Sequence, residues 1–128
     1  RELDYSPADR AENLRRVGHI AKILNDHGII AICSFISRNN SIRNQIADII
    51  GRDRFHLFYM KAPLEYCRRN KPELYEKAER GEVDNLPGVD LEYQEPENAS
   101  LVFDPIENEI NIDRIIDYLE KNKIFPIK

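Results

Sequence analysis

The sequence predicts an α/β fold, a three-layer sandwich in which helices cover both faces of a parallel sheet. The apolar run at 29–34 is typical of a strand buried on both faces of such a sheet, and the largely apolar segments 55–60 and 100–103 are predicted as two further strands. Amphipathic patterns with helical spacing lie between these runs. Because parallel strands need crossover connections, helices that alternate with buried strands indicate one α/β domain over residues 1–128.

The first helix carries clear start and stop signals. Ser6 can cap it, Pro7 suits the first helical position, and Asp9 places an acid three residues after the cap. Gly28 supplies the C-terminal stop. Apolar residues recur between these signals at helical spacing, at Leu14, Val17, Ala21 and Leu24.

The remaining elements follow in the order of the chain. Further helices are predicted at 41–50, 63–69, 72–80 and 110–121, and strands at the three apolar runs. The segment 81–98 is different, because it is acidic, carries Pro and Gly, and shows no sustained periodicity. Loops of this length are uncommon in compact domains and often act as lids. We therefore expect a lid at about 81–98; a surface excursion without a role is the alternative.

Composition excludes several classes of partner. The net charge of −4 argues against a nucleic-acid-binding face, which is usually basic. No apolar run approaches the roughly 20 residues that a membrane span needs, so neither a membrane nor a nucleic acid is an expected partner. We expect a cytoplasmic protein in which Cys33 and Cys67 are buried free thiols. Their spacing is not that of metal ligands, and no metal site is predicted.

Arginines gather at the start of the first helix. The spacing places Arg10, Asn13, Arg15 and Arg16 at one end of that helix, near the carboxyl edge of the sheet. Ligands of α/β folds bind at that edge, and guanidinium groups bind anions. We expect one of Arg15 and Arg16 to face the ligand and the other to pair with Asp9 or Glu12. The sequence predicts a site for something anionic.

Three segments together resemble the adenylylsulfate kinase family, whose members transfer the γ-phosphoryl of ATP to the 3′-hydroxyl of a sulfonucleotide. The family pattern R-D-L-G-F-S-x-x-D-R-x-E-N-x-R-R is matched from Arg1 to Arg16, with Asp4 for Gly and Tyr5 for Phe. The family's F-I-S is Phe35-Ile36-Ser37 here. Its lid pattern is matched in outline by residues 81–96. The resemblance covers essentially the whole chain.

The resemblance implies a P-loop-kinase-like fold, ATP and Mg²⁺ as cofactors, a small nucleotide as substrate and a homodimer as the assembly. It implies that Tyr5 stacks on the acceptor base and that Arg68 or Arg69 reaches over ATP. Its other implied acceptor contacts are Arg10, Asn13, Ile36, Ser37, Leu86 and Gly88. For Ser37 a strand-end turn is the structural alternative.

One family feature does not occur in these residues. A G-x-x-x-x-G-K-[ST] phosphate loop, which surrounds ATP phosphates with backbone N–H groups and a Lys, is missing from the sequence. The family's usual catalytic base, an Asp in a D-G-D segment, would also lie upstream of Arg1, so the catalytic residues are unknown. We favour an N-terminal strand, phosphate loop and helix upstream of these residues. The alternative is a fragment that cannot catalyse.

Departures from the family pattern leave the acceptor open. Leu86 and Asp84 stand where the family has Phe and Lys, and the P-Y-R that follows F-I-S is lost although Arg43 is retained. The favoured acceptor is adenylylsulfate, as in sulfate assimilation. The first alternative is a kinase for another nucleotide, such as the cytidine diphosphoramidate of capsule biosynthesis. The second is a non-catalytic nucleotide sensor.

Overall fold

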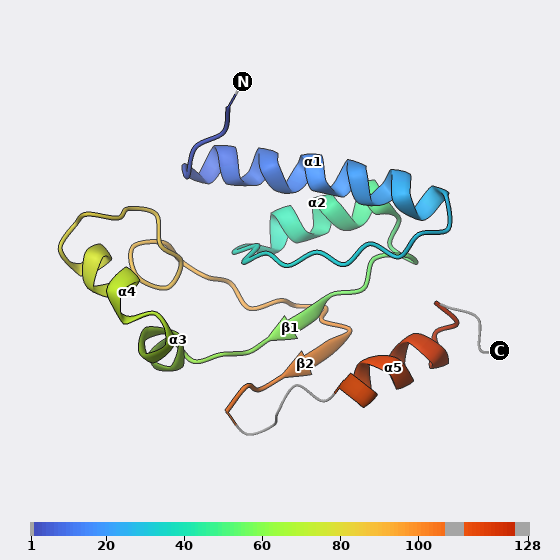
Figure 1. Cartoon of the computed structure of the whole chain (residues 1–128). Coiled ribbons are helices and arrows are strands. Elements are labelled where there is room, and N and C mark those ends of the chain that lie inside the picture. Colours follow the sequence, from blue (N-terminus) through green and yellow to red (C-terminus); the bar gives the residue numbers. More distant parts are fainter. Residues whose placement is uncertain (1, 107–111, 125–128) are drawn as a thin grey trace.

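The computed structural model describes residues 2–106 and 112–124, in which helices flank a short parallel sheet (Figure 1). In chain order the elements are α1 (Pro7–Asp26), α2 (Asn40–Ile50), β1 (Phe58–Met60), α3 (Leu64–Asn70), α4 (Pro72–Glu79), β2 (Leu101–Phe103) and α5 (Ile112–Lys121).

The sheet confirms the predicted α/β class. β1 and β2 are parallel, with Phe58 opposite Leu101 and Met60 opposite Phe103. Helices α1 and α2 lie on one side of the sheet and α5 on the other (Figure 1). The Tyr118 ring of α5 meets the Phe58 ring edge-on at 5.4 Å, which anchors α5 to the sheet.

Helix α1 begins where the sequence predicts. The Ser6 hydroxyl accepts the N–H of Asp9 at 3.3 Å, and Pro7 occupies the first turn. The helix then packs on α2 at Gly18, where an added Cβ would lie 3.4 Å from Ile46 Cγ2. The core between the two helices consists of Ala21, Ile42, Ile46 and Ile50.

The other helices lie close to their predicted places. α2 starts at Asn40 because the Asn39 side chain accepts the N–H of Ile42 at 2.9 Å. α3 and α4 follow Pro63 and Lys71, and Pro72 opens α4. The predicted start of the last helix, residues 110 and 111, lies outside the described residues.

The segment 29–34 differs from its prediction as a buried strand. It is extended in the structure, but it pairs with no strand among the described residues. Ile32 is 94% exposed and Cys33 is exposed too, whereas Ala31 packs on the core between α1 and α2. A strand exists only through hydrogen bonds to a neighbour, and no described segment supplies one here. The predicted burial of Cys33 is therefore wrong for these residues, and Cys67 is only partly buried.

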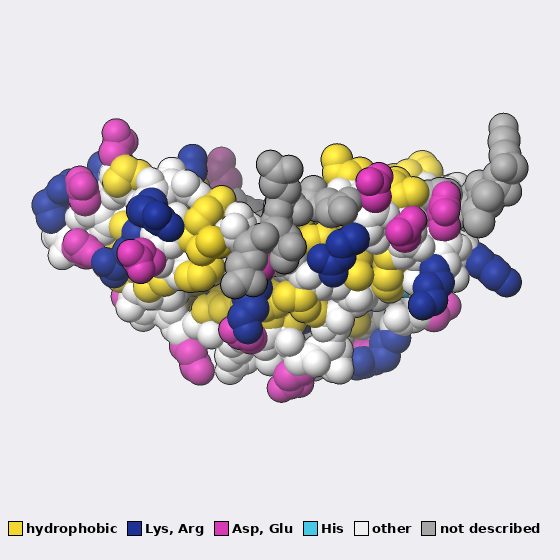
Figure 2. Space-filling model, turned by 90° about the horizontal axis from the view of Figure 1, so that it is seen from below, with side chains coloured by type: hydrophobic (Ala, Val, Ile, Leu, Met, Phe, Trp, Pro, Cys, Tyr) yellow, Lys and Arg dark blue, Asp and Glu magenta, His cyan; other side chains and the backbone are white. Residues whose placement is uncertain are grey.

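Apolar surface is left uncovered elsewhere as well. Figure 2 shows hydrophobic side chains gathered across the middle of one face, with charged side chains around them. Met60, Val102 and Ile116 are among the exposed large apolar residues. Contiguous exposed apolar surface marks a place where another segment or molecule packs.

No helix in the described part of the chain combines the length and the apolar character that crossing a membrane requires.

Candidate functional site

The start of α1 brings three predicted acceptor residues onto one helical end. Arg10 donates from Nε to the carbonyl of Tyr5 at 2.9 Å, and its guanidinium lies 5.4 Å from the centre of the Tyr5 ring. Tyr5 itself is 78% exposed, so one of its faces is available to a planar ligand. Asn13 is exposed within the same helix. A helix start with an adjacent guanidinium favours anionic groups.

Asp9 holds the residues before α1 in place. Its carboxylate accepts the N–H of Asp4 at 3.1 Å, while Asp4 accepts the N–H of Ser6 at 2.7 Å. Asp9 is one of two buried charged residues in the described part of the chain. The resulting chain of side-chain caps fixes the backbone on which Tyr5 sits.

The pairing with an acid that was expected of one of Arg15 and Arg16 is made by both of them. Both pair with Glu12, at 2.7 Å and 2.9 Å. The hydrogen bond from Arg15 and then that from Arg16 lower the pKa of the Glu12 carboxyl to about 2. Residues three and four apart share a helical face, so one acid can serve both arginines. In this structure both arginines are held by Glu12 on the surface of α1.

A tight turn in the predicted lid contains Leu86 and Gly88. The Asp90 carboxylate accepts the N–H groups of Asn85 and Leu86, each at 2.5 Å, and Gly88 N–H donates to Leu91 at 2.7 Å. Gly88 has a φ of 85°, which residues with a side chain rarely adopt. Leu86 is buried, so its side chain does not form an open face.

Electrostatics links this turn to α1. Loss of surrounding water alone would raise the pKa of the Asp90 carboxyl, but the backbone hydrogen bonds hold that pKa below its ordinary value. The positive charge of Arg10 acts on Asp90 in the same direction. Arg10 therefore lies within electrostatic reach of the lid turn, although about 80 positions separate it from Asp90 in the chain.

Ile36 and Ser37 follow the unpaired segment and precede α2. Ile36 is exposed, and Ser37 has a φ of 34°, in the left-handed region. The Ser37 carbonyl accepts a hydrogen bond from the Arg43 guanidinium. These two residues therefore stand at the end of an extended segment, with the Ser37 backbone held from α2.

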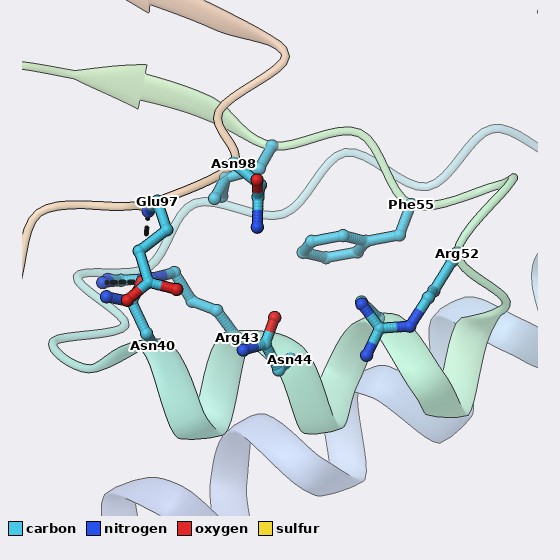
Figure 3. A pocket seen from close by; sticks show the side chains of 9 residues that line it. Asn40, Arg43, Asn44, Arg52, Phe55, Glu97 and Asn98 are labelled. Carbon is cyan, nitrogen blue, oxygen red and sulfur yellow. Dashed lines mark hydrogen bonds between the residues drawn. The ribbon is translucent and has the colours of Figure 1, made fainter.

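Arg43 closes one end of a cavity of about 180 Å³ between α2 and the segments that precede β1 and β2 (Figure 3). Figure 3 shows its side chain directed toward Asn40 and the backbone near Glu97, while Arg52 and Phe55 occupy the other end. The cavity is lined by Asn40, Arg43, Asn44, Ala47, Arg52, Phe55, Leu57, Glu97 and Asn98. Arg43 was not among the predicted site residues. Its retention in an otherwise altered family pattern was the one available signal.

Arg68 and Arg69, predicted to reach over ATP, lie in the last turn of α3. Arg68 pairs with Glu79 of α4 at 2.8 Å and lies 5.8 Å from the centre of the Tyr75 ring. Arg69 is exposed. The structure thus gives Arg68 a place between α3 and α4, and it leaves Arg69 at the surface. Neither is joined to the start of α1 by a described contact.

No group of three or more His, Cys, Asp or Glu side chains suited to a metal ion occurs within residues 2–106 and 112–124.

Fold and geometry together define an α/β protein whose candidate anion site lies where a helix begins. The profile of the family described as "Adenylylsulphate kinase" matches residues 1–104. The "Adenylyl-sulfate kinase" of Staphylococcus carnosus is 37% identical over 125 residues, which is 95% of this chain and 63% of that protein. That of Bacteroides thetaiotaomicron is 38% identical over 126 residues, 93% of this chain and 63% of that protein. The chain belongs to the adenylylsulphate kinase family.

Solved structures agree with this assignment. The Mycobacterium tuberculosis APS kinase CysC, determined in complex with AMPPNP and APS, superposes with a TM-score of 0.81 at 37% identity. The likeness covers 92% of this chain and 70% of that one. The chain spans under two thirds of the length of the curated relatives named above.

Proposed function

We propose that residues 1–128 form the acceptor-binding and lid part of an ATP-dependent kinase that phosphorylates the 3′-hydroxyl of adenylylsulfate. One observation carries this: Arg10 lies over the exposed Tyr5 ring at the start of α1, with the Asp90 turn as its electrostatic neighbour. An aromatic face beside a guanidinium suits a purine nucleotide that carries an anionic group. The names of the relatives support this acceptor.

The acceptor contacts follow from what each side chain can do. Tyr5 offers its open ring face to the base, and Arg10 offers N–H donors to phosphate or sulfate oxygens. Asn13 can donate and accept on the same helical end. Ile36 and Ser37 offer backbone groups and a hydroxyl, and the positive φ of Gly88 lets the lid turn approach closely. Leu86 is buried within that turn.

The described residues supply only some of the contacts that ATP would need. Arg68 or Arg69 would contribute positive charge to its phosphates, since both stand at the end of α3. The phosphate loop, the catalytic base and the ligands of Mg²⁺ belong, in this proposal, to polypeptide outside residues 1–128. When bound, ATP with its Mg²⁺ supplies the phosphoryl group. What the described residues contribute is placement of the acceptor and exclusion of water by the lid.

The exposed segment 29–34 supports the proposal that the phosphate loop lies on polypeptide outside residues 1–128. Its apolar side chains are those of a strand buried on both faces, yet Ile32 is open to solvent here. We propose that a strand leading to the phosphate loop pairs with this segment. A cytoplasmic homodimer is part of the same proposal.

A second acceptor is favoured by one observation. Asp84 and Leu86 replace a cation and an aromatic ring of the family pattern, and Leu86 is buried in the lid turn. A pocket without the second aromatic ring and with an added acid would suit another base, such as that of cytidine diphosphoramidate.

The deciding experiment is ATP consumption by the full-length gene product, with adenylylsulfate and cytidine diphosphoramidate offered separately. Turnover with adenylylsulfate is the expected result. Turnover with the cytidine compound alone would assign Asp84 and Leu86 to specificity. Turnover with neither, in a protein shown to contain a phosphate loop, would overturn the kinase proposal and leave nucleotide sensing.

A further inference from the structure

We infer that Arg43 is a positioning residue, which locks the loop carrying Ile36 and Ser37 to the trailing end of the lid segment. The inference rests on the proposed function, because it assigns a consequence for binding of the acceptor. It concerns a side chain that touches neither the start of α1 nor the lid turn in any described contact.

The guanidinium of Arg43 is shared among three chain segments. It donates to the carbonyl of Ser37 through Nη1 and to the carbonyl of Gln94 through Nη2. It also donates to the Asn40 side-chain oxygen, at 3.2 Å from Nε and 2.9 Å from Nη2. The side chain is only 4% exposed. A charge buried to this degree is tolerated only when its hydrogen bonds are satisfied, so the three segments are needed together.

Aromatic packing also holds the Arg43 guanidinium in this position. The Tyr93 ring lies 5.8 Å from the guanidinium carbon of Arg43, and it stacks on the ring of Tyr59 with centres 6.3 Å apart. Tyr59 belongs to β1, so the guanidinium is held against the sheet as well as against the two loops.

A second set of hydrogen bonds joins the same two segments. Gln94 N–H donates to Arg38 at 2.8 Å, and Asn40 N–H donates to the Gln94 side chain at 3.1 Å. The Asn40 side chain donates to Glu95 at 3.1 Å and accepts from Glu97 N–H at 3.3 Å. The segment 92–97 is therefore fixed to the start of α2. By contrast, the hydrogen bonds given above for the turn 85–91 run within that turn.

The arrangement bears directly on the acceptor loop. Ser37 has a positive φ, which a residue with a side chain adopts only when its surroundings hold it there. The bond from Arg43 to the Ser37 carbonyl is such a hold. Loosening it would let the Ser37 hydroxyl and the Ile36 backbone leave the orientation that the acceptor meets.

The test compares Arg43→Lys and Arg43→Met with Arg52→Lys and Arg52→Met in the full-length protein. Arg52 lines the same cavity, but it is 64% exposed and pairs only locally, with Asp48 at 2.7 Å. A lysine ammonium cannot span the three acceptors of Arg43, so both Arg43 changes should raise the acceptor KM about tenfold or more. The ATP KM and kcat should stay within about twofold, and the Arg52 variants should match the wild type.

Hydrogen exchange supplies a readout that does not depend on turnover. Arg43→Lys should speed amide exchange in 37–40 and in 92–97 together. An unchanged acceptor KM, or a fall of all kinetic parameters in parallel with the melting temperature, would overturn the inference, as would faster exchange in only one segment. If the wild type turns over no acceptor, the proposed function fails. The exchange result still decides whether Arg43 joins the loop 37–40 to the segment 92–97. If Arg43→Met does not fold, Arg43→Lys and Asn40→Ala decide it.

Discussion

Arg10 combines a hydrogen bond to the Tyr5 carbonyl, a contact with the Tyr5 ring and a free planar edge, and lysine could not provide all three at once. Its Nε is occupied by the Tyr5 carbonyl, which leaves the terminal nitrogens for an anion. We expect Arg10→Lys in the full-length protein to raise the acceptor KM about tenfold or more while the ATP KM changes little. Initial-rate kinetics with each substrate varied in turn provides the measurement.

A matched control for Arg10 lies at the other end of α1. Arg54 pairs with Asp26 at 2.8 Å on the surface, so Arg54→Lys should leave both KM values unchanged. If Arg10→Lys raised the ATP KM and left the acceptor KM unaltered, Arg10 would belong to the nucleotide-triphosphate side of the site.

Protonation of His56 should make the stability of the fold depend on pH. It is partly buried and its Nδ1 lies 2.8 Å from the Tyr118 hydroxyl. Burial lowers its pKa below the ordinary value of 6.5, against the opposing influence of Asp53. The unfolded chain therefore binds more protons than the folded one near and below pH 6.5, so stability falls as the pH falls through that value.

His56→Gln should flatten this dependence. Urea unfolding measured from about pH 8 to about pH 5 should show a smaller loss of the free energy of unfolding in the variant than in the wild type. Tyr118→Phe keeps the burial of His56 and should keep the slope. Equal slopes for His56→Gln and the wild type would show that His56 does not control stability in this range.

Local sequence signals predicted the contacts of some residues and missed those of others. The Ser6 cap was predictable because capping depends on neighbours within one turn. The double pairing of Glu12 was not, since spacing alone allows either Arg15 or Arg16 to take the acid. The role of Arg43 was out of reach, because its bond to Gln94 spans 51 positions.

At the scale of elements, the contact between α1 and α2 depends on Gly18. Its hydrogen faces Ile46 and Ile49 at distances that leave room for a methyl group and nothing larger. We expect Gly18→Ala to raise the free energy of unfolding by up to about 1 kcal/mol, through better helix propensity. Gly18→Leu should lower it by about 2 kcal/mol through overpacking. Urea unfolding of both variants measures this, and equal stabilities would show that the two helices do not meet at Gly18.

Helices were predicted better than strands, for a physical reason. A helix makes its hydrogen bonds within one segment, so periodicity and caps nearly suffice for α1 and α2. A strand needs a partner that periodicity does not identify. β1 and β2 pair with each other, whereas the apolar segment 29–34 pairs with no strand among the described residues.

At the scale of the whole molecule, Ile32 tests whether another strand completes the sheet. In the full-length protein Ile32→Ala should lower the free energy of unfolding by about 2 kcal/mol or more, because a covered Ile would be truncated. Ile23, exposed on α1, provides a control in which the same change should stay within about 0.5 kcal/mol. Denaturant unfolding compares the two, and an equally small effect at Ile32 would mean that the segment stays open.

The open segment 29–34 also has a consequence for handling the polypeptide. Its backbone N–H and C=O groups are free of ladder bonds, and its side chains are strongly apolar. Such an edge recruits any other extended chain, including a second molecule of the same kind. Expressed alone, residues 1–128 should self-associate with rising concentration, visible as light scattering, and Ile32→Lys should suppress it. The side chains proposed here to pair with a further strand would then be the same ones that drive self-association of residues 1–128.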